Sequence, residues 1–142
     1  MAQLVDSYGF RDGPRKLVPL PVDSSTSAIR AGDFLTQATA GYYKRAAAGD
    51  TVYAIAAASL DTAPSADGLA TILADVGNES TYEYPAGTGT LTAAMSGQNC
   101  DAGGPRSLDV TAATDKAFYI VSVNLTTATA IVRLNCTAAG VV

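Results

Sequence analysis

The sequence predicts an all-β protein, a small antiparallel β-barrel or sandwich with an extended N-terminal arm. Short runs rich in β-branched and aromatic residues recur at a spacing of about 8–12 residues, with turn residues between them. No segment requires a helix longer than one or two turns. At 142 residues the chain fits one domain with a buried core. We expect the arm over residues 1–25 and a single β-rich domain over residues 26–142.

The expected arm combines helix-breaking residues with apolar side chains. Its glycines and prolines are Gly9, Gly13, Pro14, Pro19 and Pro21, and proline supplies no donor to a central β-ladder. Because its apolar content is too high for a free tail, we expect the arm to lie against its own barrel or a neighbouring subunit, and we favour the neighbour. The expected contact residues are apolar or basic: Leu4, Val5, Tyr8, Phe10, Arg11, Arg15, Lys16 and Leu17.

Two Gly-Asp pairs mark corners between strands in the first half of the domain. Gly32-Asp33 and Gly49-Asp50 each precede a β-rich run. Since glycine adopts positive φ without steric cost, we expect two structurally similar corners. Between them, a strand end is expected to place aromatic and basic side chains at the rim of the barrel. This second candidate interaction group is Tyr42, Tyr43, Lys44 and Arg45.

The clearest strand signal is a hairpin near the C-terminus. Residues 117–124 and 130–136 both alternate with period two, and a five-residue connection joins them. We also expect strands at 69–76, whose alanines and leucines suit a helix as well, and at 90–95. Residues 96–107 are expected to form a polar, glycine-rich loop.

Charge is unevenly distributed along the chain, whose net charge is −4. Residues 1–45 contain six Lys and Arg against four Asp, whereas residues 46–101 contain seven acids and no Lys or Arg. Because nucleic-acid binding needs a basic face, direct contact with DNA or RNA is not expected. A basic arm beside an acidic body suits docking onto other protein subunits. A solvated surface with chance clustering of charge is an equal alternative.

The N-terminus and the longest apolar run predict neither secretion nor a membrane span. The chain does not open with a basic segment and a long apolar one, and the apolar run at 52–58 is far below the ~18–20 residues that cross a bilayer. We expect a soluble protein made in a cytoplasm. The two cysteines, Cys100 and Cys136, suit neither a disulfide-rich scaffold nor a metal cluster, and a single bridge between them stays open.

The residue types that most catalytic sites need are missing or scattered. The chain has no His, which excludes a Ser-His-Asp triad, a Cys-His pair and an imidazole zinc site. The nearby acids Glu79 and Glu83 are better explained as solvated, because a sugar cleft also needs aromatic platforms and the chain has no Trp. The glycine-rich segments at 87–89 and 103–106 lack the Lys-Ser/Thr pair of a phosphate loop. We expect no cofactor, no metal and no enzymatic activity.

Several segments together resemble the small head-decoration, or cement, proteins of tailed bacteriophages. They are the corner at 31–33, the segments 38–44 and 48–56, and the closing hairpin, and the resemblance spans about residues 27–136. It implies a homotrimer that binds the outside of an expanded capsid shell and ties neighbouring major capsid subunits together. The implied partners are the major capsid protein and further copies of this chain, without direct contact to nucleic acid or membrane. The implied location is the capsid surface of the virion.

Two other structural roles remain as alternatives. A carbohydrate- or receptor-binding module of a phage tail or fibre would use an aromatic platform made of Tyr42, Tyr43, Tyr82 and Tyr84. A tail-tube or head-completion subunit would form rings or occur in low copy number. No motif in the sequence distinguishes either alternative from the capsid-cement role.

Overall fold

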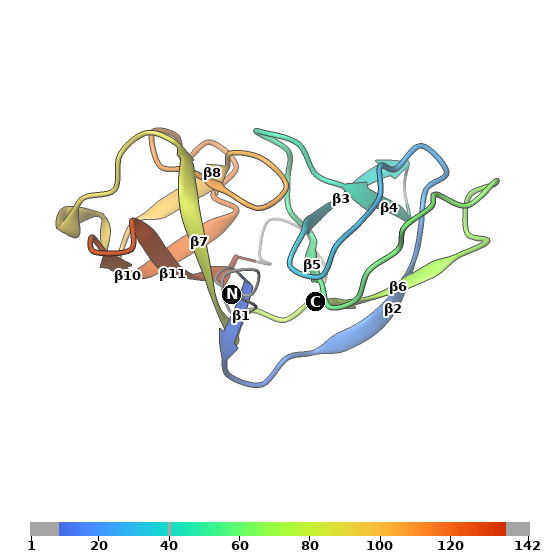
Figure 1. Ribbon diagram of the computed structural model, residues 1–142, viewed down its shortest axis with the longest axis horizontal. Coiled ribbons are helices and arrows are strands. Elements are labelled where there is room, and N and C mark those ends of the chain that lie inside the picture. Colours follow the sequence, from blue (N-terminus) through green and yellow to red (C-terminus); the bar gives the residue numbers. More distant parts are fainter. Residues whose placement is uncertain (1–8, 40, 136–142) are drawn as a thin grey trace.

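The computed structural model describes residues 9–39 and 41–135, and the all-β prediction is confirmed. A closed five-stranded barrel lies beside a second, antiparallel sheet (Figure 1). The described residues include one short 3₁₀ turn, η1 (Ala93–Met95). The strands are β1 Gly9–Asp12, β2 Leu17–Pro21, β3 Phe34–Thr39, β4 Tyr42–Arg45, β5 Ala54–Ala56, β6 Thr71–Asp75, β7 Thr81–Thr88, β8 Asn99–Ala102, β9 Leu108–Asp109, β10 Phe118–Asn124 and β11 Thr129–Leu134.

The barrel consists of β7, β11, β10, β8 and β9, in that order. Antiparallel pairs join successive strands, and a parallel pairing of β7 with β9 closes the ring. Every second residue points inward, as strand geometry requires. Tyr82 and Tyr84 of β7 and Phe118 and Ile120 of β10 are buried in this way. Aromatic and aliphatic side chains therefore fill the barrel interior.

The second sheet has the order β2-β6-β5-β3-β4 and is antiparallel throughout. Its two faces contribute to different cores because consecutive strand residues point to opposite sides. The ring centroid of Phe34 lies 4.7 Å from that of Tyr84 and 4.6 Å from that of Phe118. The next residue, Leu35, joins a separate apolar cluster. The barrel core thus continues into one face of the second sheet.

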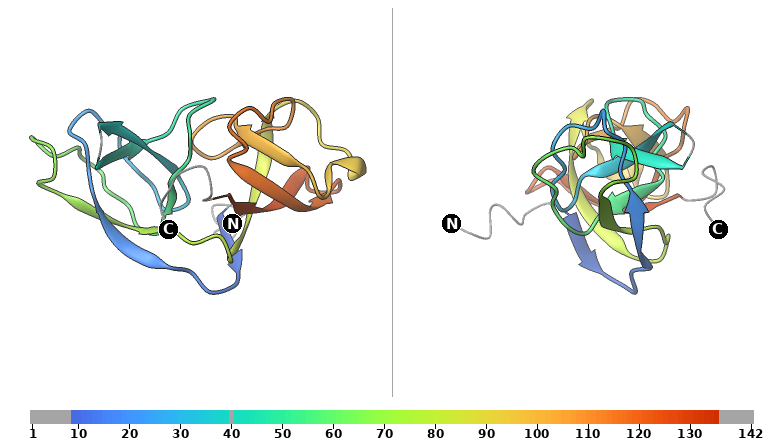
Figure 2. Two further views of the ribbon diagram at one scale, coloured as in Figure 1. Left: turned by 180° about the vertical axis from the view of Figure 1, so that it is seen from behind. Right: turned by 90° about the vertical axis from the view of Figure 1, so that its right-hand side faces the viewer.

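Residues 9–21, which we call the strap, run along one long side of the molecule and join its two halves (Figures 1 and 2). β1 pairs with β7 of the barrel, and β2 pairs with β6 of the second sheet. Leu20 of β2 is buried in the second apolar cluster. The described part of the expected arm therefore packs on its own chain, which is the less favoured of the two expected arrangements. Leu4, Val5 and Tyr8 lie outside the described residues.

The two Gly-Asp corners have the same geometry, as predicted. The glycine φ is positive in both, +96° at Gly32 and +80° at Gly49. In each corner the aspartate backbone N–H donates to the carbonyl oxygen three residues earlier, and its carboxylate accepts the N–H of that same residue at 2.8 Å. The dipeptide recurs because glycine supplies the backbone angle and aspartate supplies the second hydrogen bond.

Two sequence interpretations in the middle of the chain are wrong. The expected strand at 90–95 is irregular chain followed by η1, and the expected loop at 96–107 contains β8, which pairs with β10. β8 contributes only two small residues to the core, Cys100 and Ala102. This pattern of apolar residues is too short to indicate a strand in a segment rich in glycine and polar residues. The expected strand at 69–76 is confirmed as β6, and the C-terminal hairpin is confirmed as β10 and β11.

Candidate interaction surface

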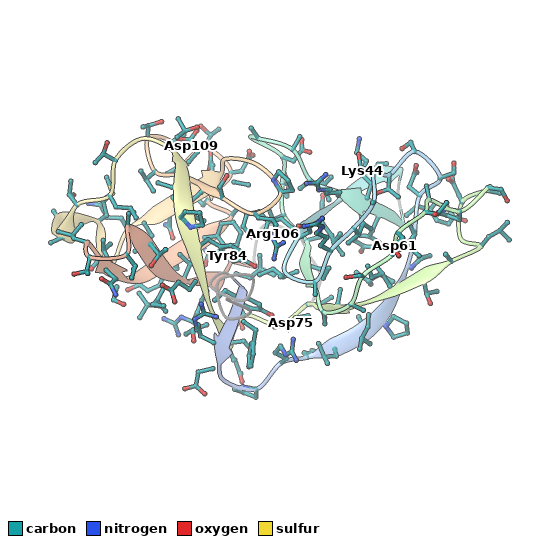
Figure 3. All side chains as sticks on the ribbon, in the orientation of Figure 1. Lys44, Asp61, Asp75, Tyr84, Arg106 and Asp109 are labelled. Carbon is teal, nitrogen blue, oxygen red and sulfur yellow. The ribbon has the colours of Figure 1, made fainter. Side chains whose placement is uncertain are left out.

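A groove of about 560 Å³ lies where the strap, the barrel and the second sheet meet, and we call it the central groove. Segments far apart in the sequence supply its walls: the strap, the corner at 30–32, the chain at the end of β5, and the barrel. Figure 3 shows Arg106 and Tyr84 in the middle of the molecule, between the two sheets. The main side chains of the groove are Phe10, Arg15, Arg30, Asp61, Tyr82 and Arg106.

The strap supplies one aromatic ring and one guanidinium group, which lie against a tyrosine of β7. Phe10 of β1 lies edge-on to the buried ring of Tyr82, with the ring centroids 5.7 Å apart. The guanidinium carbon of Arg15 lies 4.2 Å from the centroid of the Phe10 ring, within the range at which a cation is attracted to an aromatic face. Phe10 keeps 37% of its surface exposed. Phe10 and Arg15 therefore lie at the opening of the groove.

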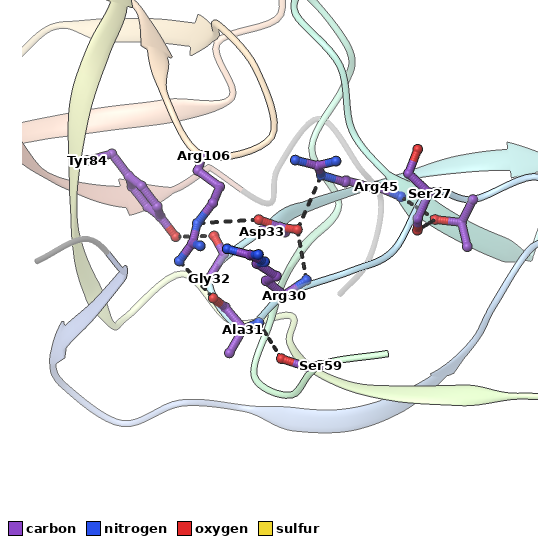
Figure 4. Close-up of polar contacts among 10 residues, drawn as sticks. Ser27, Arg30, Ala31, Gly32, Asp33, Arg45, Ser59, Tyr84 and Arg106 are labelled. Atoms are coloured by element: carbon purple, nitrogen blue, oxygen red, sulfur yellow. Dashed lines mark hydrogen bonds and ion pairs between the residues drawn. The ribbon is translucent and has the colours of Figure 1, made fainter. Parts of the chain in front are cut away.

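On the other side of the groove, Asp33 connects the second sheet to a barrel loop (Figure 4). Its side chain is fully buried. One carboxylate oxygen lies 3.4 Å from Nε of Arg106. The other lies 3.3 Å from Nε of Arg45 and accepts the backbone N–H of Arg30 at 2.8 Å. Because Arg106 also donates to the carbonyl oxygen of Ala31, at 2.9 Å, this barrel loop is held to the corner by two contacts.

Burial raises the pKa of Asp33 above its ordinary range, although the Arg30 backbone hydrogen bond and the guanidinium groups of Arg45 and Arg106 act in the opposite direction. Desolvation of a carboxylate offsets much of the attraction in a buried ion pair. Removal of the carboxylate is costly all the same, since it leaves two guanidinium groups without their counter-ion.

Two tyrosine hydroxyls fasten the barrel to the second sheet and its corner. The Tyr82 hydroxyl donates to Asp75 at 2.6 Å, and the same aspartate accepts the backbone N–H of Lys16 at 3.0 Å. The Tyr84 hydroxyl donates to the carbonyl oxygen of Gly32 at 2.7 Å. Burial raises the pKa of both tyrosines above its ordinary value, and at Tyr82 the Asp75 hydrogen bond adds to this effect. Both hydroxyls therefore stay protonated and act as donors.

The other strap candidates lie outside the central groove. Nε of Arg11 donates to Glu83 at 2.8 Å, and the Thr129 hydroxyl donates to the other oxygen of that carboxylate. Burial by itself raises the pKa of Glu83, but these hydrogen bonds and the Arg11 charge bring it below its ordinary value. Lys16 is exposed and is tied through its backbone to Asp75. Arg11 thus joins the strap to the barrel, and Lys16 joins it to the second sheet.

An exposed apolar strip lies on the outward face of β2 and β6, and we define it as Leu17, Pro19 and Leu73. Pro19 stands opposite Leu73 in the antiparallel register. Leu17 is two residues from Pro19 and shares its face, because side chains alternate along a strand. Leu17 is 38% exposed and Leu73 is 41% exposed. Adjacent exposed apolar side chains favour contact with another surface.

The rim candidates form β4, the last strand in the order of the second sheet, where all of them are half-buried and Tyr43 is also bridged to Val22, the residue after β2. The Tyr43 hydroxyl accepts from the Gln37 amide at 3.0 Å, and the Tyr43 ring lies edge-on to that of Tyr53, 6.2 Å away. Tyr82 and Tyr84 are core residues instead. The four-tyrosine platform of the carbohydrate-binding alternative therefore does not form. The rim candidates are Tyr42, Tyr43, Lys44 and Arg45, of which Arg45 contacts Asp33.

Sequence reasoning did not single out Arg30, Asp33 and Arg106 as a joint site. The three meet because the corner at 30–33 packs against the loop that precedes β9, and no local pattern encodes that contact. A usable signal was present in the charge distribution, since Arg106 is the first basic residue after Arg45. An isolated arginine within an acidic stretch favours a specific pairing over general solvation.

Comparisons with family models, with curated proteins and with solved structures find no match for this chain. Within residues 9–39 and 41–135, no three His, Cys, Asp or Glu side chains form a group that could hold a metal ion. The same residues include no helix long and apolar enough to span a membrane.

Cys100 is a free, buried thiol whose pKa is raised to about 12 by burial and, secondarily, by the charges of Asp101 and Asp109. Cys136 lies outside the described residues.

Proposed function

We propose that this chain is a structural protein of a tailed-phage virion, which binds the outer surface of the capsid and cements neighbouring major capsid subunits. The observation that carries the proposal is the apolar strip, in which Leu17 and Leu73 stay exposed on a paired, regular part of the second sheet. The resemblance of residues 27–136 to capsid cement proteins adds to it. Both support a role that is exercised through the protein surface.

Repeated contacts of moderate size suit such a role. A standard protein interface buries about 1,600 Å² in total, which is more than the apolar strip supplies, so we expect the strap and the rim residues of β4 to extend it. In a homotrimer the same contact occurs three times, and the later contacts form at high effective concentration. The apolar area buried across the seam between capsid subunits then opposes their separation.

Co-sedimentation with capsid shells tests the proposal. The purified protein is mixed with expanded and with unexpanded shells of the phage that encodes it, and bound protein is quantified after centrifugation. We expect saturable binding to expanded shells. The double variant Leu17→Asp, Leu73→Asp should weaken binding by about tenfold or more, because each carboxylate would have to be desolvated at an apolar contact. Leu125→Asp is the matched control, at a still more exposed leucine between β10 and β11.

Other outcomes of these measurements have definite meanings. Wild-type affinity in the double variant removes the apolar strip from the interface, and failure of the wild-type protein to bind either shell contradicts the proposal. Saturable binding of free glycans favours the receptor-binding alternative. A copy number far below that of the major capsid protein in purified particles favours a tail-tube or head-completion subunit. Sedimentation of the free protein tests the expected homotrimer.

A further inference from the structure

The central groove concentrates positive charge within an acidic protein. Among the residues that the structure describes, three guanidinium groups line it, those of Arg15, Arg30 and Arg106, and one carboxylate, that of Asp61. The whole chain has nine Lys and Arg and thirteen Asp and Glu. A cleft with such a local excess attracts anions even where the net charge of the protein is negative.

Two of the three guanidinium groups have donors to spare. Arg106 is committed to Asp33 and to the Ala31 carbonyl oxygen. Arg15 and Arg30 are exposed, and in the described part of the chain neither forms an ion pair. Since the planar guanidinium fork matches a carboxylate with two parallel hydrogen bonds, the groove offers two such forks to an incoming ligand.

The remaining lining of the groove combines apolar side chains and bare backbone with the hydroxyl of Ser59, which accepts the backbone N–H of Ala31 at 3.2 Å. Phe10 presents most of the apolar surface, since its ring is 37% exposed whereas Tyr82 and Ala56 behind it are buried. A Cβ atom placed on Gly9 would lie 4.0 Å from the Cα atom of Gly32, so two backbone segments without side chains stand close together in one wall. The volume of about 560 Å³ falls within the ~300–1,000 Å³ of pockets that enclose small ligands. It therefore has room for a short segment of chain and not for a folded domain.

We propose that the central groove binds an extended acidic segment of a partner protein, whose carboxylates pair with the guanidinium groups of Arg15 and Arg30. Every second side chain of an extended segment points to the same side. Alternating acids can therefore face the guanidinium groups together, while the small residues between them point to the opposite side and add no bulk. The assignment of this segment to the capsid shell rests on the proposed function. The expectation that the groove binds an acidic segment rests on the residues of the groove alone.

The surroundings of the groove favour peptide carboxylates over other anions. A nucleic-acid backbone requires a continuous basic track, but Asp61 lies in the groove and residues 46–101 contain no Lys or Arg. A lone phosphate ion would leave the exposed ring of Phe10 uncovered. An acidic peptide can match the guanidinium groups with its carboxylates and cover the ring of Phe10, which lies against Arg15, with the methylene groups beside them.

Titration of the free, full-length protein with a synthetic peptide tests the inference. The probe is a capped octapeptide of alternating Asp and Ala, followed by NMR of the isotope-labelled protein. We expect saturable shifts at Arg15, Arg30 and Phe10, which weaken as salt is raised. Arg15→Gln combined with Arg30→Gln should lower the affinity by about tenfold or more. Arg133→Gln is the matched control, because the Arg133 guanidinium carbon also lies over an aromatic ring, 5.2 Å from the centroid of Tyr119, outside the groove.

Further arms identify the ligand class. The same octapeptide with Asn in place of Asp should not bind, and inorganic phosphate and a single-stranded oligonucleotide should not displace the acidic peptide at equal concentration. The inference is overturned if the acidic peptide does not bind, if the double arginine variant binds it as wild type does, or if the oligonucleotide binds in its place. Peptide binding without shell binding would contradict the proposed function alone. Shell binding without peptide binding would contradict this inference alone.

Discussion

Asp33 and Asp50 occupy equivalent places in two copies of the same corner, but their surroundings differ. Each carboxylate accepts the backbone N–H three residues earlier. Asp33 is in addition fully buried and lies between the guanidinium groups of Arg45 and Arg106. Comparison of Asp33 with Asp50 therefore separates two contributions of an aspartate to stability, namely hydrogen bonding within the turn and neutralisation of nearby positive charge.

We expect Asp33→Asn to lower the free energy of unfolding by about 2 kcal/mol at pH 7. Loss of one partner of a fully buried ion pair costs about 3–5 kcal/mol, and partial exposure of both arginines reduces that figure. Asp50→Asn keeps an acceptor oxygen for the turn and loses no ion pair to any residue that the structure describes, so its cost should stay within about 0.5 kcal/mol. Urea unfolding of the two variants measures the difference. Equal losses in both would show that turn hydrogen bonding, and not charge pairing, governs the position.

At the scale of the secondary-structure elements, Glu83 links three strands through one carboxylate. It lies on β7, accepts from Arg11 of β1 and accepts from Thr129 of β11. Its pKa lies below the ordinary value of 4.5 despite its burial. The folded protein therefore holds the proton of this group less tightly than the unfolded chain does. The stabilisation is complete above pH 4.5 and is lost as the pH falls through the lowered folded-state pKa.

This linkage predicts how Glu83→Gln behaves with pH. At pH 7 the variant should be less stable than the wild type by about 1 kcal/mol, since one partly exposed charged pair and one hydrogen bond are weakened. The difference should shrink as the pH is lowered towards 3, because the wild type loses its carboxylate charge there. Urea unfolding across this pH range measures it. Glu79→Gln, which removes an exposed carboxylate and leaves the contacts of Glu83 in place, is the control and should change the stability at pH 7 little. A constant difference at all pH values would contradict the assigned linkage.

A structural element can be predicted from the sequence when the interactions that form it lie between residues close together in the chain. The Gly32-Asp33 corner was predictable because glycine φ and an aspartate hydrogen bond act within four residues. β8 was not predictable, because its strand character comes from pairing with β10 and with β9 across the barrel. The central groove was not predictable for the same reason. Arg15, Arg30 and Arg106 meet there only when both sheets are assembled.

At the scale of the whole molecule, Phe34 belongs to both halves. Its backbone lies in β3 of the second sheet, and its ring packs against Tyr84 and Phe118 of the barrel. The strap crosses between the same halves, pairing with β7 and with β6. Because the barrel core and one face of the second sheet share buried side chains, we expect neither half to unfold while the other stays intact.

Phe34→Ala tests this coupling of the two halves. The ring is fully buried, so its loss should cost about 3–5 kcal/mol. Tyrosine fluorescence and far-ultraviolet circular dichroism should still change together along urea in both wild type and variant, with the midpoint of the variant at lower urea. Phe10→Ala, at a ring that is 37% exposed, should cost about 1 kcal/mol and serves as the matched aromatic control. Two separated transitions, with one of them unmoved by Phe34→Ala, would mean that the barrel and the second sheet fold independently and that the shared core does not couple them.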